Sequence, residues 1–162
     1  AFYGAGKGIE RLMDGLRPNR ELYSVGDAAF MDSDDKFLRY IKNRADIDTD
    51  GYYDIIAHGT PEGVQITHNG QKIIIDHRTA ARLIQNSEGY KGQNVKLLAC
   101  NTGALDNGFA QKLANKLNVK VYAPTNYLWV RPTGEYFVAG MTSQKIPDMK
   151  NLGTFKNFIP GE

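Results

Sequence analysis

Two patterns of apolar and polar positions occur along the chain, and together they predict a mixture of strands and helices. Short stretches that are apolar at most positions are typical of buried strands, and we predict them at 21–30, 52–57, 94–99 and 119–124. Apolar residues that recur every three or four positions are typical of amphipathic helices, and we predict these at 32–44, at 77–89 and from about 107 to 119.

Two hairpins are predicted between these elements. The runs "GVQIT" and "KIIID" flank Asn69-Gly70, a strong two-residue turn signal. The runs "YLWV" and "EYFVAG" flank "RPTG" in the same way. The last twenty residues contain Pro147, Gly153 and Pro160 and are predicted to be irregular.

The order of these elements predicts an α/β fold. Strands that alternate with helices indicate a mainly parallel central sheet with helices on both faces and peripheral hairpins. We expect one domain over 21–162, preceded by a loosely structured lead-in over 1–20. The "GAGKG" stretch in this lead-in lacks the spacing of a phosphate-binding loop.

Polar residues end two of the predicted buried strands. "DIIA" leads to His58, and "VKLLA" leads to Cys100, the only cysteine in the chain. Functional groups on parallel sheets gather at the carboxyl ends of strands, so we expect both side chains at one rim. In such a pair the thiol can act as the nucleophile and the imidazole as the general base. The N–H groups of Gly59 and Cys100 are then candidate donors to an oxyanion.

Further residues on loops at this rim are candidates for substrate binding: Asp106, Asn107, Thr125, Asn126 and Trp129. Asp54 or Asp76 could orient His58. His68 and His77 are predicted to be surface or capping residues, and three scattered histidines with one cysteine give no zinc-binding spacing. We therefore predict no metal site.

Composition and charge narrow the class of protein. Hydrophobic residues make up 41% and charged residues 23% of the 162 residues, as in globular proteins. The net charge is +2 without a basic block, which argues against nucleic-acid binding. No apolar run reaches the roughly 18 residues needed to span a membrane. One cysteine excludes an internal disulfide and fits work in a reducing cytosol.

The two strand ends carry a family resemblance. "HG" after one apolar strand and "AC" after the next resembles the clan CD cysteine peptidases, such as caspases and legumains. The caspase signature Gln-Ala-Cys-x-Gly is met only in part, since Leu98 replaces Gln and Gly103 comes one position late. The resemblance implies a caspase-like fold, a dyad of Cys100 and His58, and an oxyanion held by Gly59.

The stretch 97–130, with "CNTG", "AQKLA" and "APT", also resembles the carboxyl-terminal domains of bacterial polymorphic toxins of the contact-dependent inhibition and RHS types. This resemblance implies a toxin or effector domain that is secreted or delivered as part of a larger bacterial protein. It would act in the target-cell cytoplasm and have a cognate immunity protein as partner.

The leading hypothesis is a cysteine peptidase toxin that cleaves a peptide substrate through an acyl-enzyme. A deamidase or amide transferase would use the same residues. The alternatives are a non-catalytic caspase-like module that binds protein, and a toxin of another class such as a nuclease. Some toxin proteases of this kind are activated by inositol phosphate, but no strongly basic pocket is evident in the sequence, and we predict no cofactor.

Overall fold

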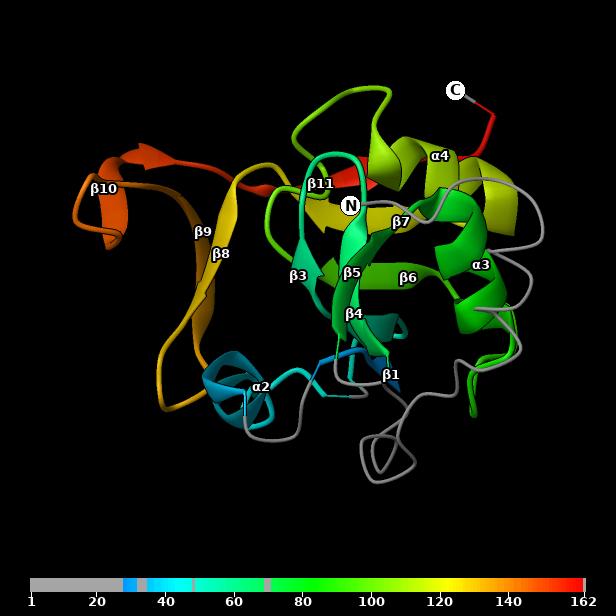
Figure 1. Cartoon of the computed structure of the whole chain (residues 1–162), viewed down its shortest axis with the longest axis horizontal. Helices are drawn as coiled ribbons and strands as arrows, with labels where there is room; N and C mark the ends of the chain where they lie inside the picture. Colours follow the sequence, from blue (N-terminus) through cyan, green and yellow to red (C-terminus); the bar gives the residue numbers. More distant parts are fainter. Residues whose placement is uncertain (1–27, 32–34, 48, 69–70, 162) are drawn as a thin grey trace.

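The computed structural model describes residues 28–31, 35–47, 49–68 and 71–161 (Figure 1). The lead-in predicted for 1–20, and all of the strand predicted for 21–30 except its last three residues, lie outside this part. Its helices are α2 (Lys36–Ile41), α3 (His77–Gln85) and α4 (Phe109–Leu117). Its strands are β1 (Ala28–Ala29), β2 (Tyr53–Ile56), β3 (His58–Gly59), β4 (Val64–His68), β5 (Gln71–Ile75), β6 (Val95–Leu98), β7 (Val121–Pro124), β8 (Tyr127–Val130), β9 (Tyr136–Met141), β10 (Pro147–Leu152) and β11 (Phe155–Phe158).

The fold is α/β, as predicted, and its central sheet is mixed. The strand order is β1-β2-β6-β7-β11, in which β1, β2, β6 and β7 run parallel and β11 pairs antiparallel with β7. Two smaller antiparallel sheets, β3-β4-β5 and β10-β9-β8, flank it. In Figure 1 the second of these, in yellow and orange, extends away from the central sheet.

Side chains that alternate along β2 and β6 build a core on each face of the central sheet. Ile55 and Leu97 pack in the cluster that includes α3, α4 and the β4–β5 hairpin. Ile56 and Leu98 pack on the other face, in the cluster that includes Leu38 and Ile41 of α2. Full burial of one such side chain stabilises the fold by about 1.5–3 kcal/mol. Helices therefore lie on both faces, as predicted.

Local sequence signals explain where the helices begin. Asp35 caps α2 by accepting the Phe37 N–H, and Asp76 caps α3 by accepting the N–H groups of Arg78 and Thr79. The helix predicted over 32–44 is shorter than expected, because it starts only after Asp35 and ends at Ile41.

The two predicted hairpins are confirmed, whereas the prediction of an irregular C-terminal region is wrong. Residues 147–152 and 155–158 form β10 and β11. Pro147 begins β10 and Gly153 lies between the two strands, so neither interrupts a strand. Phe158 packs in the cluster beneath α4, and Phe155 packs on the opposite face of the sheet. Side chains buried on both faces do not alternate with polar ones, which hides such a strand in the sequence.

Candidate active site

His58 and Cys100 follow the carboxyl ends of two neighbouring strands. Strands β2 and β6 pair in parallel with Ile56 opposite Leu98, and the Ala57 N–H donates to the Leu98 carbonyl. Beyond this bond His58 belongs to β3 and Cys100 lies in the turn after β6. Cys100 packs against the cluster that contains Ile56 and Leu98, and His58 contacts Asp35 and Phe37 at the start of α2, a helix that packs in the same cluster. The predicted juxtaposition at one rim agrees with this topology.

Gly59 fits directly against the backbone of Cys100. A Cβ at Gly59 would lie 2.5 Å from the Cys100 carbonyl oxygen and 2.8 Å from Cγ2 of Thr102. Gly59 also lies opposite Val64 in β4, while the next pair is joined by the bond from the Thr60 N–H to the Gly63 carbonyl. Antiparallel pairs alternate between bonded and non-bonded, so the Gly59 N–H points away from β4.

This close approach makes a test of Gly59 possible. Gly59→Ala should lower the free energy of unfolding by about 1–3 kcal/mol, because the added methyl group overlaps a backbone carbonyl that cannot move freely. Urea unfolding followed by circular dichroism measures this. In Gly92→Ala the methyl group meets no atom within 4 Å but sits at a φ of +85°, so its cost should be only about 1–2 kcal/mol, from backbone strain alone. A Gly59→Ala protein as stable as the parent would contradict the close packing.

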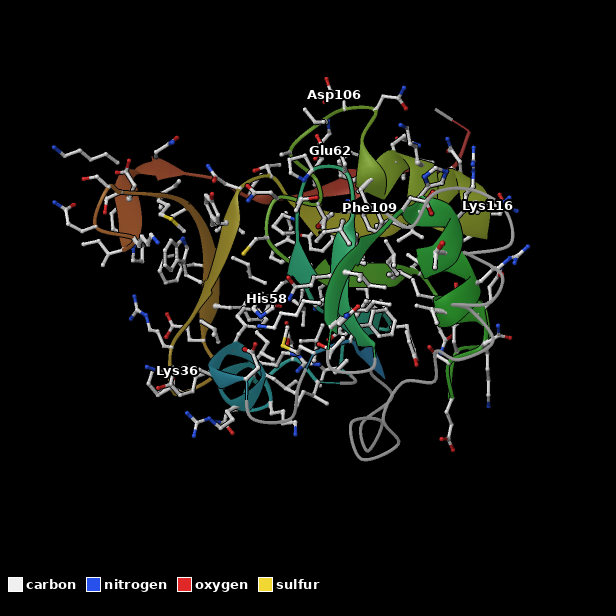
Figure 2. All side chains as sticks on the ribbon, viewed as in Figure 1. Lys36, His58, Glu62, Asp106, Phe109 and Lys116 are labelled. Atoms are coloured by element: carbon white, nitrogen blue, oxygen red, sulfur yellow. The ribbon has the colours of Figure 1, made fainter. Side chains whose placement is uncertain are left out.

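His58 is held by an acidic residue from another element. His58 Nε2 lies 2.7 Å from Oδ2 of Asp35, and its ring centroid lies 6.2 Å from that of Phe37. Burial alone would raise the pKa of Asp35, but the hydrogen bond and charge of His58 and the N–H groups of Phe37 and Leu38 outweigh it and lower that pKa. Asp35 is therefore ionised at neutral pH. Figure 2 shows His58 close to the end of α2.

The thiol of Cys100 is partly buried against β8. The Leu128 N–H donates to Cys100 Sγ at 3.3 Å, and the Leu128 carbonyl oxygen lies 3.7 Å from the same sulfur. Burial raises the pKa of the thiol, and the N–H groups of Leu128 and of Cys100 itself, which favour the thiolate, offset this only in part. The loop that follows turns sharply, with Asn101 in the left-handed region at a φ of 63°.

The predicted substrate-binding residues divide into two groups. Asp106 and Asn107 are exposed on the loop before α4, and Asp106 pairs with Lys156 at 2.7 Å. Figure 2 shows Asp106 at the tip of this loop, well away from His58. Thr125, Asn126 and Trp129 lie at or near the start of β8, which contacts Cys100.

In the second group, polar atoms of all three residues bond within the fold. The hydroxyl of Thr125 accepts the Thr154 N–H, and the side-chain carbonyl of Asn126 accepts the Tyr127 N–H. The indole N–H of Trp129 donates to the Ala139 carbonyl. Only Asn126 is tied to the loop of the thiol, through its backbone carbonyl, which accepts the Asn101 N–H. Substrate contacts of both groups stay predictions.

The two residues predicted to orient His58 are engaged elsewhere, so that prediction is wrong. Asp54 is buried in an ion pair with Arg44 at 2.8 Å, and Asp76 caps α3. The partner is Asp35, a residue of the helix predicted over 32–44 that was not predicted to contact His58. Leu128 was missed as well, because a backbone contact leaves no trace in the side-chain pattern. Among the other histidines, His77 is the first residue of α3, and the side chain of His68 lies outside the described part.

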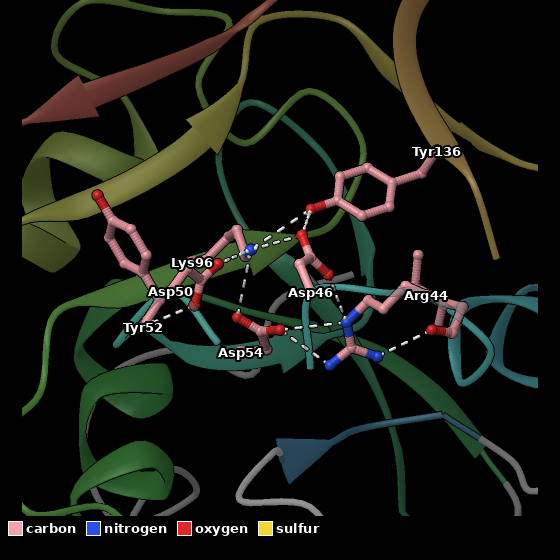
Figure 3. Close-up of polar contacts among 8 residues, drawn as sticks. Arg44, Asp46, Asp50, Tyr52, Asp54, Lys96 and Tyr136 are labelled. Atoms are coloured by element: carbon pink, nitrogen blue, oxygen red, sulfur yellow. Dashed lines mark hydrogen bonds and ion pairs between the residues drawn. The ribbon is translucent and has the colours of Figure 1, made fainter. Parts of the chain in front are cut away.

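A second cluster of polar side chains lies on the same face of the sheet, further back along the strands. Lys96 of β6 is 2% exposed, and its ammonium group contacts Asp46, Asp50 and Asp54 (Figure 3). The Tyr136 hydroxyl donates to Asp46. An open pocket of about 480 Å³ lies against Arg44, Asp46 and Tyr136. Every charge in the cluster has an opposite charge nearby, so the arrangement is that of a structural ion-pair network.

In the described part of the chain, no group of three or more His, Cys, Asp or Glu side chains is placed to hold a metal ion. None of the described helices has the length and apolar character to cross a bilayer.

Residues 26–138 match a protein family described as "Domain of unknown function (DUF8616)". The chain belongs to this family. The match covers Asp35, His58 and Cys100 and ends within β9. No curated protein and no solved structure matches the chain. The site described above therefore supplies the argument about function.

Proposed function

We propose that this DUF8616 domain is a cysteine peptidase or a related amide hydrolase with a caspase-like arrangement of its sheet. The observation that carries the proposal is the parallel, in-register pairing of β2 and β6. The pairing supports the proposal, because it brings the chain segments that lead to His58 and Cys100 to neighbouring positions at one rim. An imidazole and a thiol at such a rim are candidates for a base and a nucleophile that act together.

The reaction follows from these groups. His58 accepts the proton of Cys100, and the sulfur attacks the carbonyl carbon of the substrate amide. The Gly59 N–H, which points away from β4, donates to the developing oxyanion. The C–N bond breaks as the imidazolium of His58 gives its proton to the leaving amine. Water, deprotonated by His58, then hydrolyses the thioester and regenerates the thiol.

The biological setting is proposed from the sequence resemblance. The likeness of residues 97–130 to bacterial polymorphic toxin domains supports a toxin or effector that is delivered as part of a larger protein. A protein or peptide substrate in the target-cell cytoplasm and a cognate immunity protein as partner belong to this proposal.

One observation favours a second candidate, a non-catalytic protein-binding module. Burial raises the pKa of Cys100, and the sulfur rests against the backbone of Leu128. A thiol in that setting is less reactive than one held as a thiolate. The two candidates differ in whether His58 changes the chemistry of Cys100.

The test measures covalent labelling of Cys100 by a peptidyl acyloxymethyl ketone, which requires attack on a carbonyl in the site. We expect rapid labelling of the parent at neutral pH and labelling at least about 100-fold slower in His58→Ala, because general base catalysis is worth roughly that much. His77→Ala, a histidine at the start of α3, is the matched control and should label like the parent. Equal labelling of the parent and His58→Ala would refute the hydrolase and leave the binding module.

A further inference from the structure

We propose that Asp35 is the positioning residue of this site: it fixes His58 as the Nε2–H tautomer and so makes Nδ1 the nitrogen that accepts the proton of Cys100. The inference rests on the hydrolase proposed above. It extends that proposal from two residues to three, and the third comes from the N-terminal cap of α2, an element that precedes both strands in the chain.

The first step of the argument is the direction of the hydrogen bond. His58 Nε2 and Asp35 Oδ2 are 2.7 Å apart. An ionised carboxylate has no hydrogen to donate, so Nε2 carries the hydrogen and donates it. In the neutral ring only one nitrogen is protonated, which leaves the lone pair on Nδ1. Nε2 is thereby excluded as the base while the contact lasts.

The second step is that Asp35 is itself held rigidly. Its other carboxylate oxygen, Oδ1, accepts the Phe37 N–H at 2.9 Å and caps α2. The buried side of α2, Leu38 and Ile41, packs in the cluster that contains Ile56 and Leu98. These two residues lie two positions before His58 and Cys100 on their strands. The acid is therefore anchored to the same layer that carries the histidine and the thiol.

The third step is that the Asp35 carboxylate is mostly shielded from solvent, whereas His58 is more open. Their side chains are 22% and 42% exposed, and the ring of Phe37 lies beside that of His58. The lowered pKa of Asp35 keeps the carboxylate ionised through the neutral range. A carboxylate that orients an imidazole in this way selects its tautomer and stabilises the imidazolium that forms during reaction.

The chain offers a matched control for the capping role. Asp76 caps α3 through Oδ1, which accepts the N–H groups of Arg78 and Thr79. Asp76 and Asp35 thus share the helix-capping function, and only Asp35 contacts His58. Asparagine is as good a cap as aspartate, so an Asp→Asn change at either position should preserve the helix.

The experiment compares the parent with Asp35→Asn, Asp35→Ser and Asp76→Asn. The tautomer of His58 is read from imidazole ¹⁵N chemical shifts by NMR, and reactivity is read from labelling of Cys100 by the peptidyl acyloxymethyl ketone. The parent should show Nε2–H. When the introduced asparagine uses its oxygen as the cap, its amide N–H₂ faces His58, so Asp35→Asn should shift the ring toward Nδ1–H. Labelling should then fall about 100-fold, as expected for a misplaced base.

Asp35→Ser keeps a capping oxygen but loses the partner of His58, and it should give a mixture of tautomers with intermediate labelling. Asp76→Asn should leave both readouts as in the parent. A parent with Nδ1–H, or an Asp35→Asn protein with an unchanged tautomer and rate, would overturn the role of Asp35. The His58→Ala result judges the hydrolase separately, since it can hold while Asp35 fails, and the tautomer can be read even if labelling never occurs.

Discussion

Cys100→Ala is expected to lose all measurable amide hydrolysis, a fall of at least about 1000-fold, while the protein stays folded. The sulfur is the atom that forms the acyl-enzyme, and oxyanion donors and substrate binding alone leave only a small residual rate. The change removes two weak hydrogen bonds between the sulfur and the backbone of Leu128, which together cost about 1–2 kcal/mol. The measurement is release of a fluorophore from a panel of peptidyl amides, with the unfolding midpoint determined in parallel.

Growth of bacteria that express the domain in the cytoplasm provides the second readout of this prediction. Toxicity should disappear in Cys100→Ala and in His58→Ala. The control is His77→Ala, at the first position of α3, which should leave toxicity in place. A Cys100→Ala protein that remains toxic would direct attention to the binding-module or nuclease alternatives.

Lys96→Met should produce the largest loss of stability, roughly 3–5 kcal/mol in the free energy of unfolding. Lys96 is almost fully buried, and three carboxylates, Asp46, Asp50 and Asp54, surround its ammonium group. Removing one partner of a buried ion pair leaves the other charges uncompensated, which is the cause of a loss of this size. Urea unfolding monitored by fluorescence measures it.

The matched control for Lys96 is Lys156→Met. That change breaks an exposed ion pair with Asp106 and should leave the unfolding midpoint unchanged, since exposed pairs contribute little. A loss no greater than that of Lys156→Met would contradict the picture of a buried network.

The stability difference between the parent and Lys96→Met should also depend on pH. Burial lowers the pKa of Lys96, but its contacts with Asp50, Asp54 and Asp46 outweigh this and raise it. A raised lysine pKa stabilises the fold below the ordinary value of 10.5 and stops doing so as the pH rises through the folded value. The pKa of Asp46 is lowered, because hydrogen bonds from Tyr136 and Lys96 outweigh burial, so its contribution is lost as the pH falls below 3.8. The difference in the free energy of unfolding should be greatest between the acid range, where Asp46 becomes protonated, and the alkaline range, where Lys96 loses its proton. It should shrink as the pH enters either range.

Much of the fold could be predicted because its local signals agree with its tertiary structure. Strands β2 and β6 read as apolar runs since both of their faces are buried, and the hairpin of β4 and β5 is marked by Asn69-Gly70. The juxtaposition of His58 and Cys100 followed from the rule that parallel strands share one carboxyl edge. The sequence did not predict that β2 and β6 are adjacent; the structure shows this.

The missed features share a physical cause. Asp35 reaches His58 across 23 positions of sequence and from a different element, so no periodic pattern links them. One carboxylate oxygen of Asp35 caps α2 and the other contacts His58, and nothing in the local sequence indicates this second contact. The contact of Leu128 with the sulfur is made by the backbone, and the pattern of side-chain types does not predict backbone contacts. Strand β11 was missed because Phe158 and the partly buried Phe155 pack on opposite faces.

The antiparallel pairing of β11 with β7 has a consequence for synthesis on the ribosome. Translation makes β7 about thirty positions before β11, and in the interval the outer edge of β7 has no partner among the residues that the structure describes. An open strand edge invites pairing with other chains. Nascent copies of this domain should therefore be more prone to aggregate through β7 during the short period before Phe155–Phe158 emerge and cover its edge.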